Sequence, residues 1–359
     1  MSKQLSYVSE TRLDNQSAYS VHTLKMVNSF CKNNVRTNLY LPNLNRKINL
    51  NVIKKIFNLQ SKKNFEIINV NNKNINHFID RMIFGYKTAS LINKESIILT
   101  RSLITSFFLC IHKKKHLLEI HNELRGFTYF IFIFLNFINS PYINKIIFIS
   151  RSLSSYFKIN KNKFIILHDG ADISNFNYEP KKTNKIKNIT YVGSFYKGRG
   201  IELIFKIAKF FPQLSFRLYG DNKNNHLEKT KNLKLFNYQP HYKIPYILKK
   251  SDILLMPFEK KVYVNSKNLN TAKYMSPLKM FEYLASGRII ISSNIKVLKE
   301  VLNKKNSIIV KKNDLSSWIE EIQKLIQNKY NIKNICKNAR ATANKYSWDK
   351  RAEKIINIQ

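Results

Sequence analysis

Short apolar runs rich in β-branched residues alternate along the chain with longer segments whose apolar positions recur at helical spacing. This alternation is typical of parallel α/β sheets, in which a helix connects each strand to the next. In the first half of the chain it predicts strands at residues 5–9, 36–41, 97–100, 116–121, 146–150 and 164–167. The clearest helices predicted there span residues 17–31 and 151–157.

A second alternating series follows a stretch near residues 172–187 that is rich in Asn and Lys and lacks the pattern. This series predicts strands at residues 189–192, 215–219, 253–257, 288–292 and 308–310. It predicts helices at residues 201–210, 242–249, 278–285, 315–327 and 332–346.

The chain is therefore predicted to be an α/β protein with two doubly wound, Rossmann-like domains. We expect an N-terminal domain at residues 1–172, a linker at 173–187 and a C-terminal domain at 188–345. Residues 346–359 are expected to form a closing helix, for which packing against the N-terminal domain is one option. Ligands of open α/β sheets bind beyond the carboxyl ends of the strands, so the two domains are expected to face each other across a cleft that holds the active site.

Length and charge narrow the function. A chain of 359 residues with 44% apolar content can bury two cores. The net charge of +40 is spread over both halves, with 25 Lys and Arg against 9 Asp and Glu up to Asp172, and 37 against 13 after it. A coding bias toward AT-rich codons explains this composition, and attraction to anionic lipid or polyphosphate ligands is the functional alternative. Nucleic acid is not expected as a partner, because the sequence has no RNP-type motif, zinc finger or arginine-rich tail.

The location of the protein is predicted from three features. The most hydrophobic segment, residues 127–138, is shorter than the roughly 20 residues that a spanning helix needs. We expect a buried helix there; an interfacial segment that contacts anionic membrane with help from residues 113–115 and Arg125 is the alternative. Residues 1–8 run directly into a strand, so no signal peptide is expected. Three dispersed cysteines indicate neither a disulfide framework nor a zinc site, as in a cytoplasmic protein.

The first segment with candidate chemistry is residues 191–200, YVGSFYKGRG. It reads as a strand followed by glycines and two cations before a helix. Glycine lets a backbone approach a phosphate, the helix N-terminus offers unpaired N–H groups, and Lys197 and Arg199 would neutralise a diphosphate in place of a metal ion. An ordinary strand-to-helix turn with solvated cations would have the same pattern.

The second segment is residues 276–293, SPLKMFEYLASGRIIISS. It predicts a loop, a short helix that ends at Gly287, and a buried parallel strand. Lys279 and Glu282 share one face of the helix, where Lys279 could bind phosphate and Glu282 could accept hydrogen bonds from ribose hydroxyls. An amphipathic helix with both charges in water is the alternative. A ligand with phosphates and sugar hydroxyls, a nucleotide sugar, fits the first interpretation.

Together these segments resemble the C-terminal domain of the retaining family 4 glycosyltransferases (glycosyl transferases group 1), which have the GT-B fold. Residues 251–257 are similar to a strand motif of that family and residues 347–352 to its closing helix. In the first half, residues 17–22, 119–121 and 168–172 are similar to family motifs in the same order, so the resemblance extends over essentially the whole chain.

The resemblance implies a role for each matching residue. The catalytic set would be His121, Lys197 and Arg199. The donor-binding residues would be Gly193, Ser194, Lys197, Arg199, Ser276, Leu278, Lys279 and Glu282. The acceptor-side residues would be Ser17, Tyr19, Glu119 and Asn122. No metal ion and no cofactor are expected, since the nucleotide sugar is a substrate. The family often has a second glutamate eight residues before Glu282, and this chain has Tyr274 there.

The resulting hypothesis is a retaining, metal-independent glycosyltransferase that acts on a glycan or lipid-linked saccharide in surface polysaccharide, cell-wall or lipopolysaccharide biosynthesis. It would work in the cytoplasm, with the inner face of the membrane as a further option. Two other functions stay open from the sequence. One is a GT-B nucleotide-sugar epimerase, because a fold does not fix a reaction. The other is a non-catalytic protein that binds glycans or nucleotide sugars, which Tyr274 favours.

Overall fold

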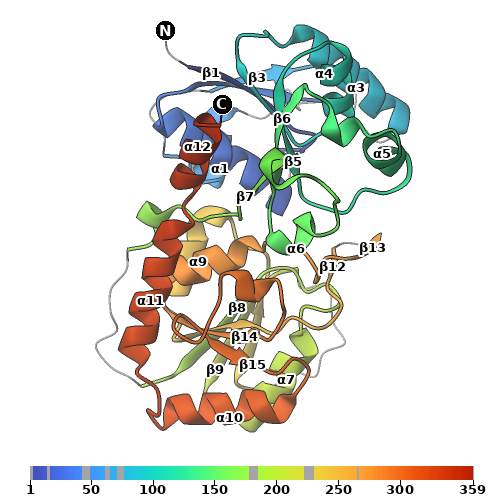
Figure 1. Cartoon of the computed structure of the whole chain (residues 1–359). Helices are drawn as coiled ribbons and strands as arrows, with labels where there is room; N and C mark the ends of the chain where they lie inside the picture. Colours follow the sequence, from blue (N-terminus) through green and yellow to red (C-terminus); the bar gives the residue numbers. More distant parts are fainter. Residues whose placement is uncertain are drawn as a thin grey trace. The chain divides into compact units, whose positions relative to one another are not determined.

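The computed structural model describes residues 3–13, 17–42, 49–60, 65–70, 77–177, 185–221, 230–264 and 267–358. The chain divides into two compact units (Figure 1). The first comprises Met1–His168 and Trp348–Gln359, and the second comprises Asp169–Ser347. The division follows His168, earlier than the predicted boundary after Asp172. Part of the predicted linker, residues 178–184, lies outside the described residues.

The first unit contains a sheet of seven parallel strands in the order β3-β2-β1-β4-β5-β6-β7. The strands are β1 (Gln4–Val8), β2 (Arg36–Leu41), β3 (Glu66–Asn69), β4 (Ile97–Thr100), β5 (His116–Ile120), β6 (Ile143–Phe148) and β7 (Phe164–Ile166). Its helices are α1 (Ala18–Lys32), α2 (Leu50–Ile56), α3 (Phe78–Leu91), α4 (Leu103–Ile111), α5 (Gly126–Tyr129), α6 (Arg151–Ser154) and α12 (Trp348–Ile356). The strand order reverses between β1 and β4.

The second unit contains a sheet of six parallel strands in the order β10-β9-β8-β11-β14-β15. The strands are β8 (Asn188–Val192), β9 (Ser215–Tyr219), β10 (Leu233–Phe236), β11 (Ile253–Met256), β14 (Ile289–Ser293) and β15 (Ile308–Val310). Its helices are α7 (Ile201–Phe210), α8 (Ile244–Lys249), α9 (Leu278–Ser286), α10 (Leu315–Ile326) and α11 (Ile332–Lys345). An antiparallel hairpin of β12 (Tyr263–Val264) and β13 (Lys267–Asn270) follows β11. The order reverses between β8 and β11.

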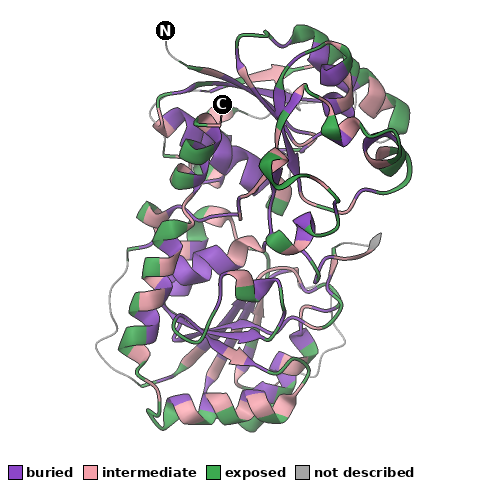
Figure 2. Ribbon diagram, in the orientation of Figure 1, coloured by how far each residue is buried: buried purple, intermediate pink, exposed green. Residues whose placement is uncertain are grey.

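The central strands of the second unit are buried on both faces, as the purple ribbon in Figure 2 shows. In β11, Ile253 and Leu255 belong to the apolar cluster on one face of the sheet, together with Trp318 of α10. Leu254 and Met256 belong to the cluster on the other face, which contains α9. Alternate side chains thus enter different cores, which explains why such a strand is a continuous apolar run in the sequence.

The two doubly wound sheets confirm the predicted fold class. One local prediction is wrong: residues 127–138 do not form a buried helix. They form the end of α5, the π-helical segment η1 (Phe130–Phe134) and the short 3₁₀-helix η2 (Phe137–Asn139). Only Ile131, Phe132 and Ile138 of these residues are buried.

Candidate functional site

The segment after β8 forms a tight loop against its own chain. Gly200 has a φ of +72°, and a side chain there would collide with the carbonyl of Pro257. Gly193, directly after β8, lies against the ammonium group of Lys279, and a Cβ would occupy the position of that group. The two glycines are therefore needed for different reasons. Gly200 permits the loop to pack, and Gly193 leaves room for a charged side chain.

The predicted form of residues 276–293 agrees with the structure. Helix α9 begins after Pro277 and ends at Gly287, which has a φ of +61°, and β14 follows. A glycine at this position accepts the left-handed conformation that ends a helix. This arrangement carries Lys279 and Glu282 on the first turns of α9.

Two cations lie together beside aromatic rings at this point. The Nζ of Lys279 is 3.8 Å from the centroid of the Tyr191 ring and 5.4 Å from that of Phe258. The guanidinium carbon of Arg199 is 5.3 Å from the centroid of Phe258. The Nζ of Lys279 and the Nε of Arg199 are buried and have no hydrogen-bond partner in the described part of the chain. The rings stabilise the cations only in part.

The environment disfavours both charges. Burial, and secondly the neighbouring Arg199, lower the pKa of Lys279 well below its usual value. Burial likewise lowers the pKa of Arg199. The described residues place no acid within ion-pair distance of either cation. Two desolvated cations without an acid can be satisfied by a ligand with at least two negative charges.

The location of these cations in the sheet supports a ligand site. Gly193 follows β8, and Phe258 lies just beyond β11, so both mark the carboxyl ends of adjacent strands. The strand order reverses between these two strands, and the crevice at such a point is where open α/β sheets bind ligands.

Glu282 has a partner that the sequence analysis missed. Its Oε1 lies 2.6 Å from the Nε2 of His241, and the side chains are 11% and 15% exposed. Burial, with Glu282 as a second cause, raises the pKa of Tyr238 to about 12. His241 follows β10, an edge strand that the sequence did not predict. Only the short polar turn after residues 233–236 could have indicated that a strand ends there and places His241 near Glu282. His241 thus contacts one oxygen of the carboxylate that is expected to bind ribose.

The other predicted donor-side residues are placed as follows. The Oγ of Ser276 accepts a hydrogen bond of 3.0 Å from the backbone N–H of Asp169. The carbonyl of Ser194 accepts one from the Tyr191 hydroxyl, and Leu278 opens α9 half-buried. Lys197 is exposed, and among the described residues no contact joins its side chain to Arg199 or Lys279. The structure thus groups Arg199 with Lys279, whereas the sequence analysis paired Arg199 with Lys197.

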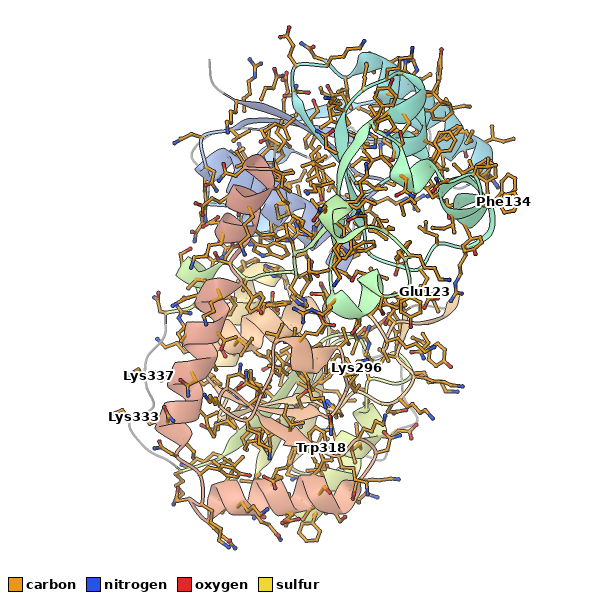
Figure 3. All side chains as sticks on the ribbon, in the orientation of Figure 1. Glu123, Phe134, Lys296, Trp318, Lys333 and Lys337 are labelled. Atoms are coloured by element: carbon orange, nitrogen blue, oxygen red, sulfur yellow. The ribbon has the colours of Figure 1, made fainter. Side chains whose placement is uncertain are left out.

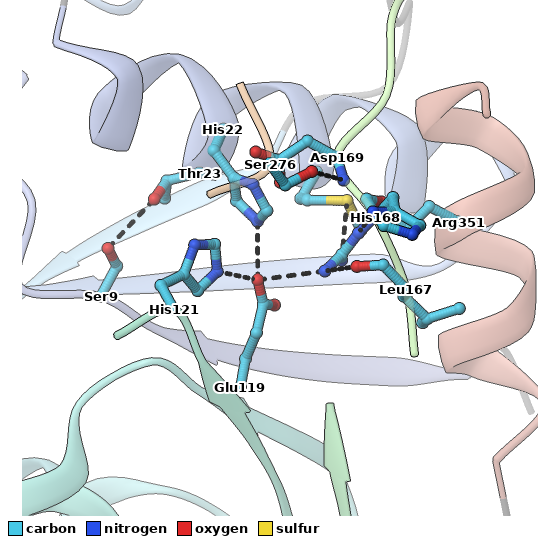
Figure 4. A network of polar contacts seen from close by, with 11 residues as sticks. Ser9, His22, Thr23, Glu119, His121, Leu167, His168, Asp169, Ser276 and Arg351 are labelled. Carbon is cyan, nitrogen blue, oxygen red and sulfur yellow. Dashed lines mark hydrogen bonds and ion pairs between the residues drawn. The ribbon is translucent and has the colours of Figure 1, made fainter. Parts of the chain in front are cut away.

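In the first unit, a buried carboxylate lies against three basic side chains (Figure 4). Glu119, near the end of β5, is fully buried. Its Oε1 accepts hydrogen bonds from the Nη2 of Arg351 at 3.1 Å and from the Nε2 of His121, and it lies 2.9 Å from the Nε2 of His22. Helix α12 supplies Arg351, and its guanidinium also donates to the carbonyls of Leu167 and His168.

The network pairs the Glu119 carboxylate with the Arg351 guanidinium. Although burial opposes ionisation, Arg351, and after it His22 and His121, lower the pKa of Glu119. Burial, and secondly Arg101, lower the pKa of His121 to about 3, so this imidazole is neutral at neutral pH. One carboxylate then faces one guanidinium. The acceptor-side role of Glu119 stays a prediction; in the structure its carboxylate is buried and bonded to His121.

His22, Glu119 and His121 also offer three metal-ligand atoms within 4.8 Å of one another. Two imidazoles and one carboxylate are a donor set that zinc uses. Arg351 already binds the Glu119 oxygen that both imidazoles contact, so a cation would compete with a guanidinium for it.

The predicted acceptor-side residues follow β1 or lie at the carboxyl end of β5, and Arg101 follows the intervening strand β4. Ser17 caps α1, and the Tyr19 hydroxyl accepts from the backbone N–H of Glu10 at 3.1 Å. The guanidinium carbon of Arg101, which the sequence analysis missed, is 4.0 Å from the centroid of the Tyr19 ring. Asn122 is exposed next to His121. Because β1 and β4 flank the reversal of strand order, this is the ligand-binding edge of the first sheet.

Comparison with known proteins identifies the fold. Residues 186–328 match the family described as "Glycosyl transferases group 1". The structure is similar to a glycosyltransferase from Rickettsia africae ESF-5, at 15% identity over 99% of this chain and 97% of that one, with a TM-score of 0.74. It is also similar to HepE from Anabaena solved with UDP-glucose, at 10% identity over 98% of each chain and a TM-score of 0.71.

A third similar structure is the lipopolysaccharide outer core galactosyltransferase WaaB, at 12% identity over 98% of this chain and 99% of that one, with a TM-score of 0.67. A search of curated proteins found no match. At these identities the likeness concerns the fold, which is the two-domain GT-B fold of glycosyltransferases.

Proposed function

We propose that this protein is a glycosyltransferase that transfers a sugar from a nucleotide diphosphate donor to a glycan or lipid-linked saccharide, with retention of the anomeric configuration and without a metal ion. The observation that carries the proposal is the pair of half-buried cations Arg199 and Lys279, whose Nε and Nζ atoms are buried. Their two positive charges, which no acid of the described residues pairs, complement those of a diphosphate. The family match over residues 186–328 and the UDP-glucose in the similar Anabaena protein support the same ligand class.

Each donor-side residue has a chemical role in this proposal. Arg199 and Lys279 bind the diphosphate, whose approach Gly193 permits because it has no side chain. Glu282 accepts hydrogen bonds from the ribose hydroxyls in place of His241. Ser276 and the backbone N–H groups of Ser194 and Leu278 are proposed to contact the sugar or phosphate, and the exposed Lys197 is proposed to add positive charge at the rim.

The reaction needs charge stabilisation more than a protein nucleophile. The bond between the anomeric carbon and the diphosphate oxygen breaks, and its electron pair leaves with the diphosphate. The acceptor hydroxyl attacks on the same face, and its proton passes to the departing diphosphate. Arg199 and Lys279 stabilise the negative charge that develops, in a desolvated environment where such stabilisation is largest. On the first unit, neutral His121 is proposed to contact the donor sugar, with Ser17, Tyr19 and Asn122 on the acceptor side.

The pathway is proposed from the same evidence. The similar WaaB is a lipopolysaccharide outer core galactosyltransferase, which supports surface polysaccharide or lipopolysaccharide biosynthesis as the setting. We propose that the protein acts on the cytoplasmic side of the membrane, where nucleotide sugars are the donors.

The decisive experiment measures binding and turnover with a panel of UDP- and GDP-sugars. We expect calorimetry to detect one donor and its nucleotide diphosphate, and nucleotide release to accelerate only when a saccharide acceptor is added. NMR of the product should show the donor's anomeric configuration. A folded protein that binds no member of the panel contradicts the proposal. Turnover of the sugar without any acceptor indicates an epimerase or hydrolase instead.

Metal independence is tested separately. Because Arg199 and Lys279 supply the positive charge, EDTA should change the turnover rate by less than about twofold. Loss of activity in EDTA that Mn²⁺ or Mg²⁺ restores would show that a metal ion shares the diphosphate.

A further inference from the structure

Exposed apolar side chains are concentrated in one part of the first unit. Twenty large apolar side chains of the described residues are exposed, and eleven of them lie between Phe78 and Leu135. Ile79 and Phe134 are the most exposed of these, at 70% and 73%. Single exposed apolar residues are ordinary, but a concentration of this kind marks an interaction surface.

Aromatic contacts join these side chains into one surface across α3, α5 and η1. On α3, Ile79, Ile83 and Tyr86 follow the spacing of a single helix face. The opposite face of α3 packs on the sheet through Phe84, among others. The ring of Phe78, at the start of α3, meets the ring of Phe127 on α5 edge to face, with centroids 4.8 Å apart. We call this the α3–η1 surface.

The irregular helix η1 holds aromatic rings outward. Ile131 and Phe132 are buried and anchor the segment. Phe130 and Phe134 stack with centroids 5.2 Å apart on its exposed side, and Figure 3 shows Phe134 at the margin of the molecule. Because the buried anchor already fixes the two stacked phenyl rings, they lose little conformational freedom when they enter an apolar environment outside the protein.

Basic side chains accompany the α3–η1 surface. Lys87 and Lys94 are exposed on α3 and just beyond it, and Lys113 and Lys115 are exposed after α4. Three acids lie along the same segments, and one of them, Glu95, is exposed beside Lys94. Asp80 accepts from the backbone of His77 in the cap of α3, and Glu123 binds Arg125. An apolar surface edged by free lysines complements an anionic lipid bilayer, which offers apolar chains beneath negatively charged headgroups.

We propose that the α3–η1 surface docks the protein on an anionic membrane, with the rings of η1 and the apolar face of α3 at headgroup depth and the lysines at the lipid phosphates. No helix in the described ranges is long and apolar enough to cross a bilayer, so docking would be peripheral. A second copy of this chain is a poorer occupant, because each chain has a net charge of +40 and like charges would oppose each other.

The test is co-sedimentation with vesicles of phosphatidylcholine containing about one third phosphatidylglycerol. The apolar variant is Ile79→Glu with Phe134→Glu. Its matched control is Phe210→Glu with Ile326→Glu, which changes side chains of the second unit that are 52% and 38% exposed. We expect the constant for partition onto the vesicles to fall at least tenfold in the first variant and less than twofold in the control.

A second pair of variants tests the charges. Lys87→Glu with Lys113→Glu should weaken binding and reduce its salt dependence. The control is Lys333→Glu with Lys337→Glu on α11, at two lysines that Figure 3 labels. These substitutions make the same change in net charge. All positions are exposed, so unchanged unfolding temperatures show that each variant is folded.

Three results would overturn the proposal. The wild-type protein fails to bind the anionic vesicles at low salt. Alternatively, the control variants lose as much binding as the α3–η1 variants, which indicates attraction by the overall charge. Finally, light scattering shows a dimer that Phe134→Glu dissociates, which makes a second copy the occupant. None of these depends on nucleotide-sugar binding, so docking and the transferase function fail independently.

Discussion

The carboxyl ends of the two sheets contain buried charges in opposite arrangements. In the first unit, the Glu119 carboxylate is paired with the Arg351 guanidinium and contacts two imidazoles. In the second unit, Lys279 and Arg199 lie beside aromatic rings, and no acid of the described residues lies within ion-pair distance of them. A buried charge without a partner destabilises the folded protein, because it loses its hydration and gains no ion pair in return. The difference indicates that the first arrangement supports the structure and that the second is kept for a ligand.

The largest effect on stability is expected in the first unit. Arg351→Met leaves the Glu119 carboxylate buried without its cation, which should lower the free energy of unfolding by about 3–5 kcal/mol. Each unit contains one tryptophan, Trp348 in the first and Trp318 in the second. Urea unfolding followed by fluorescence in a Trp318→Phe background therefore reports on the first unit. A loss below about 1 kcal/mol would show that the two imidazoles alone stabilise Glu119.

The opposite outcome is expected for Lys279→Met. Removal of a buried ammonium with no hydrogen-bond partner in the described chain should leave the second unit as stable or more stable. Turnover should fall about 100-fold, because one of the two charges that stabilise the departing diphosphate is lost. Unfolding in a Trp348→Phe background and nucleotide release measure the two quantities.

The control for Lys279→Met is Lys197→Met, which changes an exposed cation in the loop between β8 and α7 that also contains Arg199. It should reduce turnover by less than about tenfold, since an exposed charge is screened by water. If Lys197→Met is the more damaging substitution, the predicted pairing of Lys197 with Arg199 is right and the grouping with Lys279 does not carry the function.

Features that depend on local sequence were predicted well. The helix over residues 278–285, its glycine end and the buried strand after it follow from neighbouring residues, and α9 and β14 have nearly these bounds. The strands β3 and β10 were missed because both are short edge strands that are only partly buried, so their apolar pattern is weak.

Partners from distant segments were not predictable. His241 contacts Glu282 from 41 residues away, and Arg351 contacts Glu119 from 232 residues away. No local spacing indicates such pairs, because the topology of the sheet brings them together. The same reason explains Lys197. In the sequence it is as close to a glycine as Arg199 is, and only the packing of the loop against the segment after β11 decides which cation is exposed.

The next effect in size is the loss of stability of the first unit at acidic pH. Burial lowers the pKa of His121 to about 3, below the 6.5 of an unfolded chain. Between these values the unfolded state binds more protons than the folded state. The free energy of unfolding of the first unit is therefore highest above pH 6.5 and falls as the pH decreases. The limit is about 1.4 kcal/mol per pH unit for each such group. Urea unfolding between pH 7 and 5 should show a shallower slope for His121→Gln.

His116 serves as the matched control for this titration. Burial lowers its pKa to about 4, and it lies in the same unit, so His116→Gln should remove a similar part of the slope. A slope that His121→Gln leaves unchanged would mean that His121 is protonated beside Glu119, and the network would then carry a net positive charge like that of the second unit.

The smallest effect is expected at Glu282, whose negative charge acts on Lys279 from beyond ion-pair distance. Glu282→Gln keeps a side-chain acceptor but loses the negative charge, so the KM for the donor should rise roughly fivefold, about 1 kcal/mol, with little change in kcat. Because Glu282 raises the pKa of Lys279, its loss should also make that ammonium easier to deprotonate. The activity of the variant should therefore decline at a lower pH on the alkaline side than that of the wild type. His241→Ala is the informative companion, since it frees the carboxylate and should lower the same KM. If both substitutions raise the KM equally, His241 contacts the donor itself.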